Sequence, residues 1–176
     1  TWAVVGEHAV PAESGGHLTA YADIAAVARA VDEGVPAPSV LLAPYGVPDG
    51  VPDVVSASGR TDLPDAARAE ARRALGHVQA WLADDRFADS RMVVVTRRAV
   101  ATARDEDVPD LAHAALWGLL RSAQTENPGR IQLIDVDEEF SFEELGSPAT
   151  RVRLAPAVDS GEPQAALRGD ALLVPR

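Results

Sequence analysis

Residues 111–137 constrain the fold of this chain more than any other segment, because a long helical pattern stops there just before a short apolar run. Apolar side chains recur at helical spacing over residues 111–123, and Asp110 can cap the first turn. The sequence Asn-Pro-Gly at 127–129 cannot continue the helix, and the run 131–136 then predicts a buried strand. A helix that returns directly as a buried strand is the building unit of α/β folds.

The rest of the chain repeats this alternation. Further strands are predicted at 2–6, 39–43, 51–57 and 92–96, and helices at 21–32, 64–83 and 110–125. We therefore expect an α/β fold with a mostly parallel sheet and helices on both of its faces. Residues 150–160 favour a short helix that Pro156 interrupts, although the alternation of Arg151 and Arg153 would also fit a strand. Residues 165–167 and 171–174 are predicted to form a terminal hairpin.

Length and charge narrow the classes of function. A chain of 176 residues with 47% hydrophobic content can bury a core, so residues 1–176 are interpreted as one domain. The formal net charge of −11 argues against nucleic acid, since the pairs at 72–73 and 97–98 are too small for a phosphate-binding surface. No apolar run approaches the roughly 20 residues of a membrane helix. Cysteine is absent, which permits a reducing compartment, and the cytoplasm is the expected location.

All sixteen basic residues are arginine, and the absence of lysine has a chemical consequence. A Schiff base, a phosphate-loop lysine and the Tyr-x-x-x-Lys pair of short-chain reductases all need an amine that this chain lacks.

A dinucleotide site on such a fold requires Gly-x-Gly-x-x-Gly after the first strand, where backbone amides reach the pyrophosphate. Here Gly6 is followed by Glu7, which would repel a phosphate, and the pair at 15–16 comes too late for the motif. We predict no cofactor-binding residues and interpret residues 6–16 as a plain turn.

Side chains that could serve as acids, bases or nucleophiles lack the partners that catalysis requires. Tyr21 and Tyr45 are interpreted as packing or surface residues, and no Tyr follows the strand at 92–96. None of the four histidines has a partner at metal-ligand spacing: His8, His17, His77 and His113. His113 is interpreted as a satisfied structural histidine and not as a base. Arg73, one helical turn from His77, would discourage protonation of that imidazole. Ser56 and Ser58 precede Gly59 without a Gly-x-Ser-x-Gly turn, which argues against a serine hydrolase. No catalytic residue is predicted.

Two further groups invite a functional interpretation. An acidic cluster could bind a hard cation, but it lacks the loop spacing of an EF-hand and is interpreted as a solvated loop without a metal: Asp135, Asp137, Glu138, Glu139, Glu143 and Glu144. Trp81 and Trp117 lie on the apolar sides of predicted helices and are expected to anchor the core or an interface.

The wording of residues 111–137, together with VVVTRRAV before it and GEPQAALRGDALLVPR after it, resembles the structural subdomain of the ketoreductase domain in bacterial modular type I polyketide synthases. The resemblance covers nearly the whole chain and is strongest over residues 92–176. It implies a truncated Rossmann-like fragment without catalysis. Because Thr1 opens directly into an apolar run without an initiator Met, the sequence also suggests a piece of a longer polypeptide.

This resemblance implies a function and a set of partners. The chain would be the scaffold half of a ketoreductase and not an enzyme on its own. A separate catalytic half, with the Gly-rich loop and the Ser/Tyr/Lys set, would use NADPH to reduce the β-keto group of a polyketide bound to acyl carrier protein. That half is the expected partner, and an adjacent enoylreductase or acyl carrier protein is a further one. The segments around Trp117 and residues 165–175 are the expected interface. A divergent nucleotide-binding enzyme and a free-standing interaction module remain the alternatives.

Overall fold

The computed structural model describes residues 1–6, 18–46, 63–142, 145 and 147–175. Within these residues the strands are β1 (Trp2–Val5), β2 (Leu18–Tyr21), β3 (Val40–Tyr45), β4 (Arg91–Arg97), β5 (Ile131–Val136), β6 (Gln164–Arg168) and β7 (Ala171–Leu173). The helices are α1 (Ile24–Asp32), α3 (Leu63–Leu82), α4 (Leu111–Glu126) and α5 (Pro148–Asp159), with a 3-10 turn η1 (Asp85–Phe87).

The described strands form one seven-stranded sheet in the order β2-β1-β3-β4-β5-β6-β7. All neighbours are parallel except β6 and β7, which pair antiparallel across a two-residue turn at Gly169 and Asp170. The central strands are rich in apolar residues, and all six residues of β5 are buried, including Gln132 and Asp135. Strands of this composition are typical of a parallel sheet that is covered on both faces.

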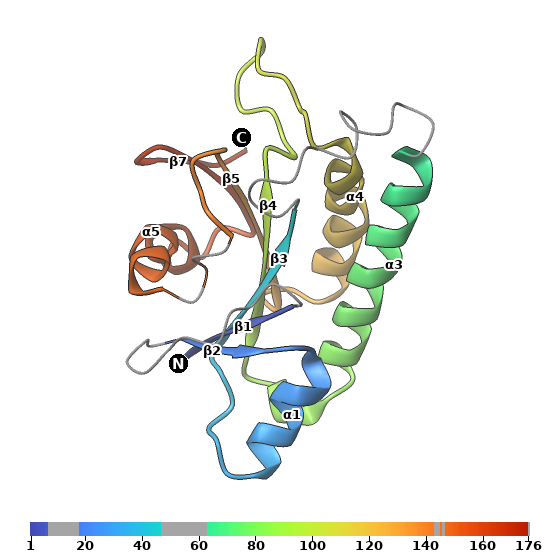
Figure 1. Ribbon diagram of the computed structural model, residues 1–176, viewed down its shortest axis with the longest axis vertical. Helices are drawn as coiled ribbons and strands as arrows, with labels where there is room; N and C mark the ends of the chain where they lie inside the picture. Colours follow the sequence, from blue (N-terminus) through green and yellow to red (C-terminus); the bar gives the residue numbers. More distant parts are fainter. Residues whose placement is uncertain (7–17, 47–62, 143–144, 146, 176) are drawn as a thin grey trace.

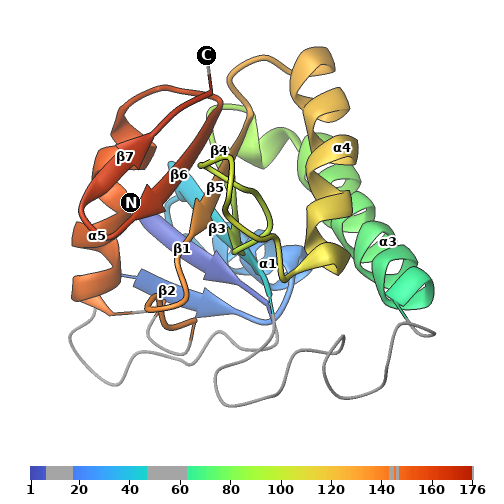
Figure 2. The ribbon, with the colours of Figure 1, turned by 90° about the horizontal axis from the view of Figure 1, so that it is seen from above.

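Helices cover the two faces unequally. Helices α1, α3 and α4 lie on one face, whereas α5 lies on the opposite face (Figure 1). Figure 2 shows the hairpin β6–β7 next to α5, at the end of the sheet that lies away from α3. A hydrophobic cluster fills each face. The cluster under α1, α3 and α4 includes Trp81 stacked on Phe87 at 4.4 Å between ring centroids, and the cluster under α5 is built on Leu154 and Val158. The expected architecture, a mostly parallel sheet with helices on both faces, is confirmed.

Side-chain caps explain where three of the helices begin. The carboxylate of Asp23 accepts the N–H of Ala26, that of Asp110 accepts the N–H of His113, and the hydroxyl of Ser147 accepts the N–H of Thr150. Each bond satisfies a donor that the first turn of a helix leaves unpaired. The expected cap at Asp110 is thus confirmed.

The structure corrects the sequence-based predictions at three places. Strand β2 (Leu18–Tyr21) was not predicted, because a four-residue edge strand gives too short a pattern. Tyr21 accordingly ends this strand and does not begin a helix. The interruption expected at Pro156 is absent, since the residue lies on the exposed side of α5, where water can replace the hydrogen bond that its ring nitrogen cannot donate. The strand predicted at 51–57 falls outside the described residues.

Candidate functional site at the carboxyl ends of the strands

Open α/β sheets bind ligands beyond the carboxyl ends of their strands, where the strand order reverses. Here that point lies between β1 and β3, because the chain adds strands on both sides of β1. A Cβ atom added at Gly46, just beyond β3, would collide with the ring of Phe142, which is itself buried. Side-chain packing from the segment after β5 therefore fills the space above the end of β3. The segment 7–16, in which no dinucleotide motif is predicted, lies outside the described residues.

The carboxylate of Asp135, near the end of β5, is completely buried, which corrects its interpretation as part of a solvated acidic loop. One of its oxygens accepts the hydroxyl of Thr96 at 2.6 Å and the N–H of Ala99 at 2.9 Å. The other accepts a guanidinium N–H of Arg168 at 2.8 Å. Burial raises the pKa of Asp135, while these donors oppose that rise. The carboxylate is therefore an internal acceptor that ties β4, β5 and β6 together.

Arg168, the last residue of β6, extends this network to the segment between β4 and α4. Its Nε donates to the carboxylate of Glu106 at 3.0 Å, and a terminal nitrogen donates to the carbonyl of Val100 at 2.8 Å. Glu106 also accepts the N–H and the hydroxyl of Thr102, and these hydrogen bonds with the Arg168 pair lower its pKa to about 2. The guanidinium of Arg168 thus holds the segment between β4 and α4 against the carboxyl ends of β5 and β6.

Trp117 completes the network from the helical side. Its indole N–H donates to the hydroxyl of Thr96 at 3.1 Å, and its ring is almost fully buried beneath α4. Trp81 is completely buried as well. The expectation that both tryptophans anchor the core is confirmed. The hydroxyl of Thr96 accepts from Trp117 and donates to Asp135, so it links α4 to the buried carboxylate.

His113 lies between α3 and α4 and has carboxylates on both sides. Its Nδ1 is 2.7 Å from an oxygen of Asp110, and its Nε2 is 3.3 Å from an oxygen of Glu70. Burial alone would lower the pKa of His113, but hydrogen bonds to Asp110 and Glu70 and their charges outweigh it and raise the pKa to about 9. The bond from His113 in turn lowers the pKa of Glu70 to about 2. His113 is thus hydrogen-bonded on both sides of its ring, and its purely structural role stays a prediction.

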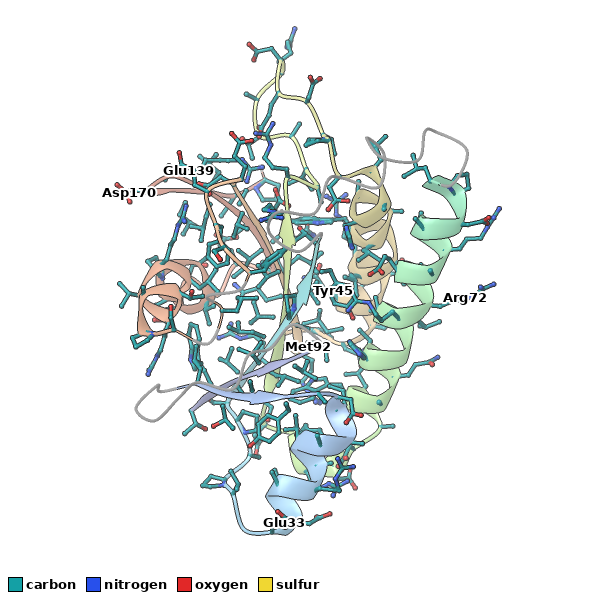
Figure 3. All side chains as sticks on the ribbon, in the orientation of Figure 1. Glu33, Tyr45, Arg72, Met92, Glu139 and Asp170 are labelled. Carbon is teal, nitrogen blue, oxygen red and sulfur yellow. The ribbon has the colours of Figure 1, made fainter. Side chains whose placement is uncertain are left out.

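Glu70 links His113 to a second group of side chains, which lies at the end of β3. Arg73 donates to Glu70 at 2.6 Å, and its guanidinium carbon lies 4.1 Å from the centroid of the Tyr45 ring. The hydroxyl of Tyr45 is 2.7 Å from Nδ1 of His77. Figure 3 shows Tyr45 pointing into the layer between the sheet and α3, whereas Arg72 points away from the sheet. Burial raises the pKa of Tyr45 above its usual range. Burial and the nearby charge of Arg73 lower the pKa of His77, as its helical spacing predicted.

The other described members of the acidic cluster differ in whether they are buried or exposed. Asp137 pairs with Arg153 at 2.8 Å and accepts the N–H of Gly169, so it is also an internal partner and not a solvated acid. Glu138 and Glu139 are exposed, as predicted. Within the described residues, no group of three or more His, Asp or Glu side chains could hold a metal ion. The remaining candidates lie outside the described residues: His8, His17, Ser56, Ser58, Glu143 and Glu144.

Two hollows flank the hairpin β6–β7. One, of about 320 Å³, lies on the α4 side and is lined by Trp117 and Arg121 of α4, Leu173 of β7 and residues of β6, among others. The second, of about 530 Å³, lies between α5 and the hairpin and is lined by Val152 and Leu172 among others. None of the helices in the described part of the chain has the length and apolar content that a membrane crossing requires.

Sequence reasoning missed most of the residues that organise these networks. Thr96, Arg168 and Glu70 were not singled out, because each has a partner far away along the chain. Asp135 lies 39 residues from Thr96 and 33 from Arg168, and His113 lies 43 residues from Glu70. One signal was available: Asp135 stands inside an apolar run, where a buried carboxylate must find a donor.

Comparison with known proteins places the whole chain in one family. The family described as "Polyketide synthase extender module SpnB, Rossmann fold domain" matches residues 1–176. Polyketide synthase GfsE of Streptomyces halstedii is 43% identical over 176 residues, which are 100% of this chain and 4% of that protein. The chain thus spans a small fraction of this relative's length.

Solved structures agree with the fold. An A1-type ketoreductase superposes with a TM-score of 0.59 at 23% identity, covering 98% of this chain and 37% of that one. A short chain dehydrogenase from Burkholderia cenocepacia J2315, solved in complex with NADP, gives a TM-score of 0.55 at 14% identity, covering 96% and 87%. At such identities the likeness shows a shared Rossmann-like architecture.

Proposed function

The chain belongs to the Rossmann fold domains of polyketide synthase extender modules, a ketoreductase-type region, and from this membership we propose that it is the non-catalytic scaffold half of a ketoreductase. The partner is a separate catalytic half, which uses NADPH to reduce the β-keto group of a polyketide carried on acyl carrier protein. The chain itself binds no cofactor and contributes no catalytic side chain.

One observation carries this proposal. Among the described residues at the carboxyl ends of β3, β4 and β5, the side chains that could act as acids or bases are bonded to other groups inside the protein. Thr96 donates to Asp135, and Tyr45 is bonded to His77. A general base must instead reach a proton on the substrate. The 176 residues also contain no lysine to activate a catalytic tyrosine.

A scaffold half would act on reduction through preorganisation. A rigid surface that fixes the substrate-side elements of the catalytic half lowers the entropy cost of reaching the reactive geometry. The buried network around Asp135 gives the present domain such rigidity, because it joins three strands, α4 and the segment that follows β4.

The proposal is tested by mixing purified halves. NADPH fluorescence is titrated with this chain alone, with the catalytic half alone and with both, and reduction of a simple ketone is followed in each case. We expect this chain alone to leave NADPH fluorescence unchanged and the pair to turn over faster than the catalytic half alone. Saturable NADPH binding by this chain at micromolar concentration would overturn the proposal, as would equal turnover with and without it.

A further inference from the structure

Strand β7 (Ala171–Leu173) is the outermost strand of the described sheet. It pairs with β6 on one side and, within the described residues, with no strand on the other. In an antiparallel pair, alternate residues direct their backbone N–H and C=O groups away from the partner. Because the two-residue turn makes Arg168 and Ala171 a hydrogen-bonded pair, the backbone groups of Leu172 are expected to point outward. An unprotected edge of this kind is a template for another strand.

The side chains of this edge meet a hollow on each face of the sheet. Leu173 is 39% exposed and lines the hollow on the α4 side together with Trp117. Leu172 lines the hollow on the α5 side, where Val152 is 74% exposed. No charged side chain occurs in β7 itself, so nothing in the strand repels an apolar partner. We call these two hollows with β7 between them the hairpin edge.

The position of the two hollows on opposite faces of the sheet favours an extended segment over a helix as the partner. Successive side chains of a strand point to opposite faces of its sheet. One extended segment lying beside β7 would therefore send alternate side chains into the α4-side hollow and the α5-side hollow. A helix packed on one face of the sheet would fill only the hollow on that face.

The hairpin edge is held in place before any partner arrives. Arg168, which ends β6, is bonded to Asp135 and to the carbonyl of Val100, a residue that lines the α4-side hollow. Trp117, in the same hollow, is bonded to Thr96. A preformed surface reduces the ordering cost of binding.

Resting on the function proposed above, we infer that an extended segment of the catalytic half adds to β7 as a further strand and places alternating apolar side chains in both hollows. The size of the comparison ketoreductase agrees with this occupant, since this chain covers only 37% of it.

Single cysteines test the inference in the intact ketoreductase that contains both halves. This chain has no native cysteine, so Leu173→Cys adds the only thiol that it contributes. The matched control is Leu75→Cys on α3, because Leu75 is 41% exposed and Leu173 is 39% exposed. We expect the thiol at 173 to react with a maleimide about tenfold slower than the thiol at 75. Equal rates in the native reductase would overturn the inference, and urea should make the two rates equal.

Hydrogen exchange distinguishes a strand paired with β7 from any other structure that covers the hairpin edge. In the intact reductase, the amide of Leu172 is expected to exchange at least about tenfold slower than in an unstructured peptide of the same sequence. A protected thiol at 173 with a freely exchanging Leu172 amide would mean that something other than a strand covers the edge, which contradicts the inference.

The two proposals fail in different ways. If turnover requires this chain while the thiol at 173 reacts freely, the scaffold function holds and strand addition at β7 is wrong. If the catalytic half reduces ketones equally well without this chain, the scaffold function is wrong, and strand addition by that half loses its basis.

Discussion

The carboxyl ends of the central strands and the hairpin edge differ in the side chains that they bury and the side chains that they expose. At the strand ends, Asp135 is completely buried and accepts hydrogen bonds from three different segments. At the hairpin edge, Leu173 and Val152 remain exposed beside two hollows. In this domain, therefore, polar side chains at the strand ends are buried and stabilise the fold. Apolar side chains stay exposed at the hairpin edge, where a partner can cover them.

The largest effect is expected from breaking the network at its centre. Replacing Asp135 with Ala removes the carboxylate that accepts from Thr96, Ala99 and Arg168. The hydroxyl of Thr96 and the N–H of Ala99 stay buried without this acceptor, whereas Arg168 keeps its pair with Glu106. We expect a loss of about 3–5 kcal/mol in the free energy of unfolding. Urea unfolding followed by tryptophan fluorescence measures it. The exposed Asp105→Ala is the control, with no comparable loss expected. Similar stabilities for the two variants would show that the network contributes little.

Raising the pH should weaken the packing of α3 on α4. The folded-state pKa of His113 is raised from 6.5 to about 9, so its stabilising contribution is complete below pH 6.5 and is lost as pH rises through 9. We expect a loss of about 3 kcal/mol between pH 6.5 and 9.5, measured by urea unfolding at constant ionic strength. The variant His113→Gln should lack this slope. An unchanged slope in the variant would assign the effect to another group.

A smaller effect is expected at the Thr96 hydroxyl, which links Trp117 and Asp135. Thr96→Val keeps the shape of the side chain but removes a donor to Asp135 and the acceptor of the Trp117 indole N–H. We expect a loss of about 1.5 kcal/mol in the free energy of unfolding. Thr96→Ser keeps the hydroxyl and should recover most of it. If Ser and Val behave alike, the methyl group and not the hydroxyl matters.

The smallest effect on stability is expected at the hairpin edge. Leu173→Asp changes an exposed side chain and should alter the free energy of unfolding of this chain by less than about 0.5 kcal/mol. In the intact ketoreductase, the same substitution should lower turnover, while Leu75→Asp on α3 should not. Equal turnover of the two variants would show that the hairpin edge does not contribute to reduction in the way that a partner-binding surface should.

Local signals explain what could be predicted from the sequence. The Asn-Pro-Gly stop fixed the junction between α4 and β5, since no helix continues through it, and Asp110 was predictable as a cap. The networks were not predictable in this way. Thr96 and Asp135 are 39 residues apart, and only the parallel pairing of β4 with β5 brings them together. Asp135 was misread because it was grouped with the exposed acids after it and not with the apolar run before it.

The strand order also carries information about how the domain is made. Among the described strands, each one after the first pairs with a strand that precedes it in the chain: β2 and β3 with β1, then β4, β5, β6 and β7 in turn. Domains begin to fold during synthesis. This sheet can therefore grow strand by strand as the ribosome releases it, without waiting for a distant segment. Among the described strands, growth in that direction reaches β7 last, so the strand that we propose to receive a segment of the catalytic half is the latest of these seven to leave the ribosome.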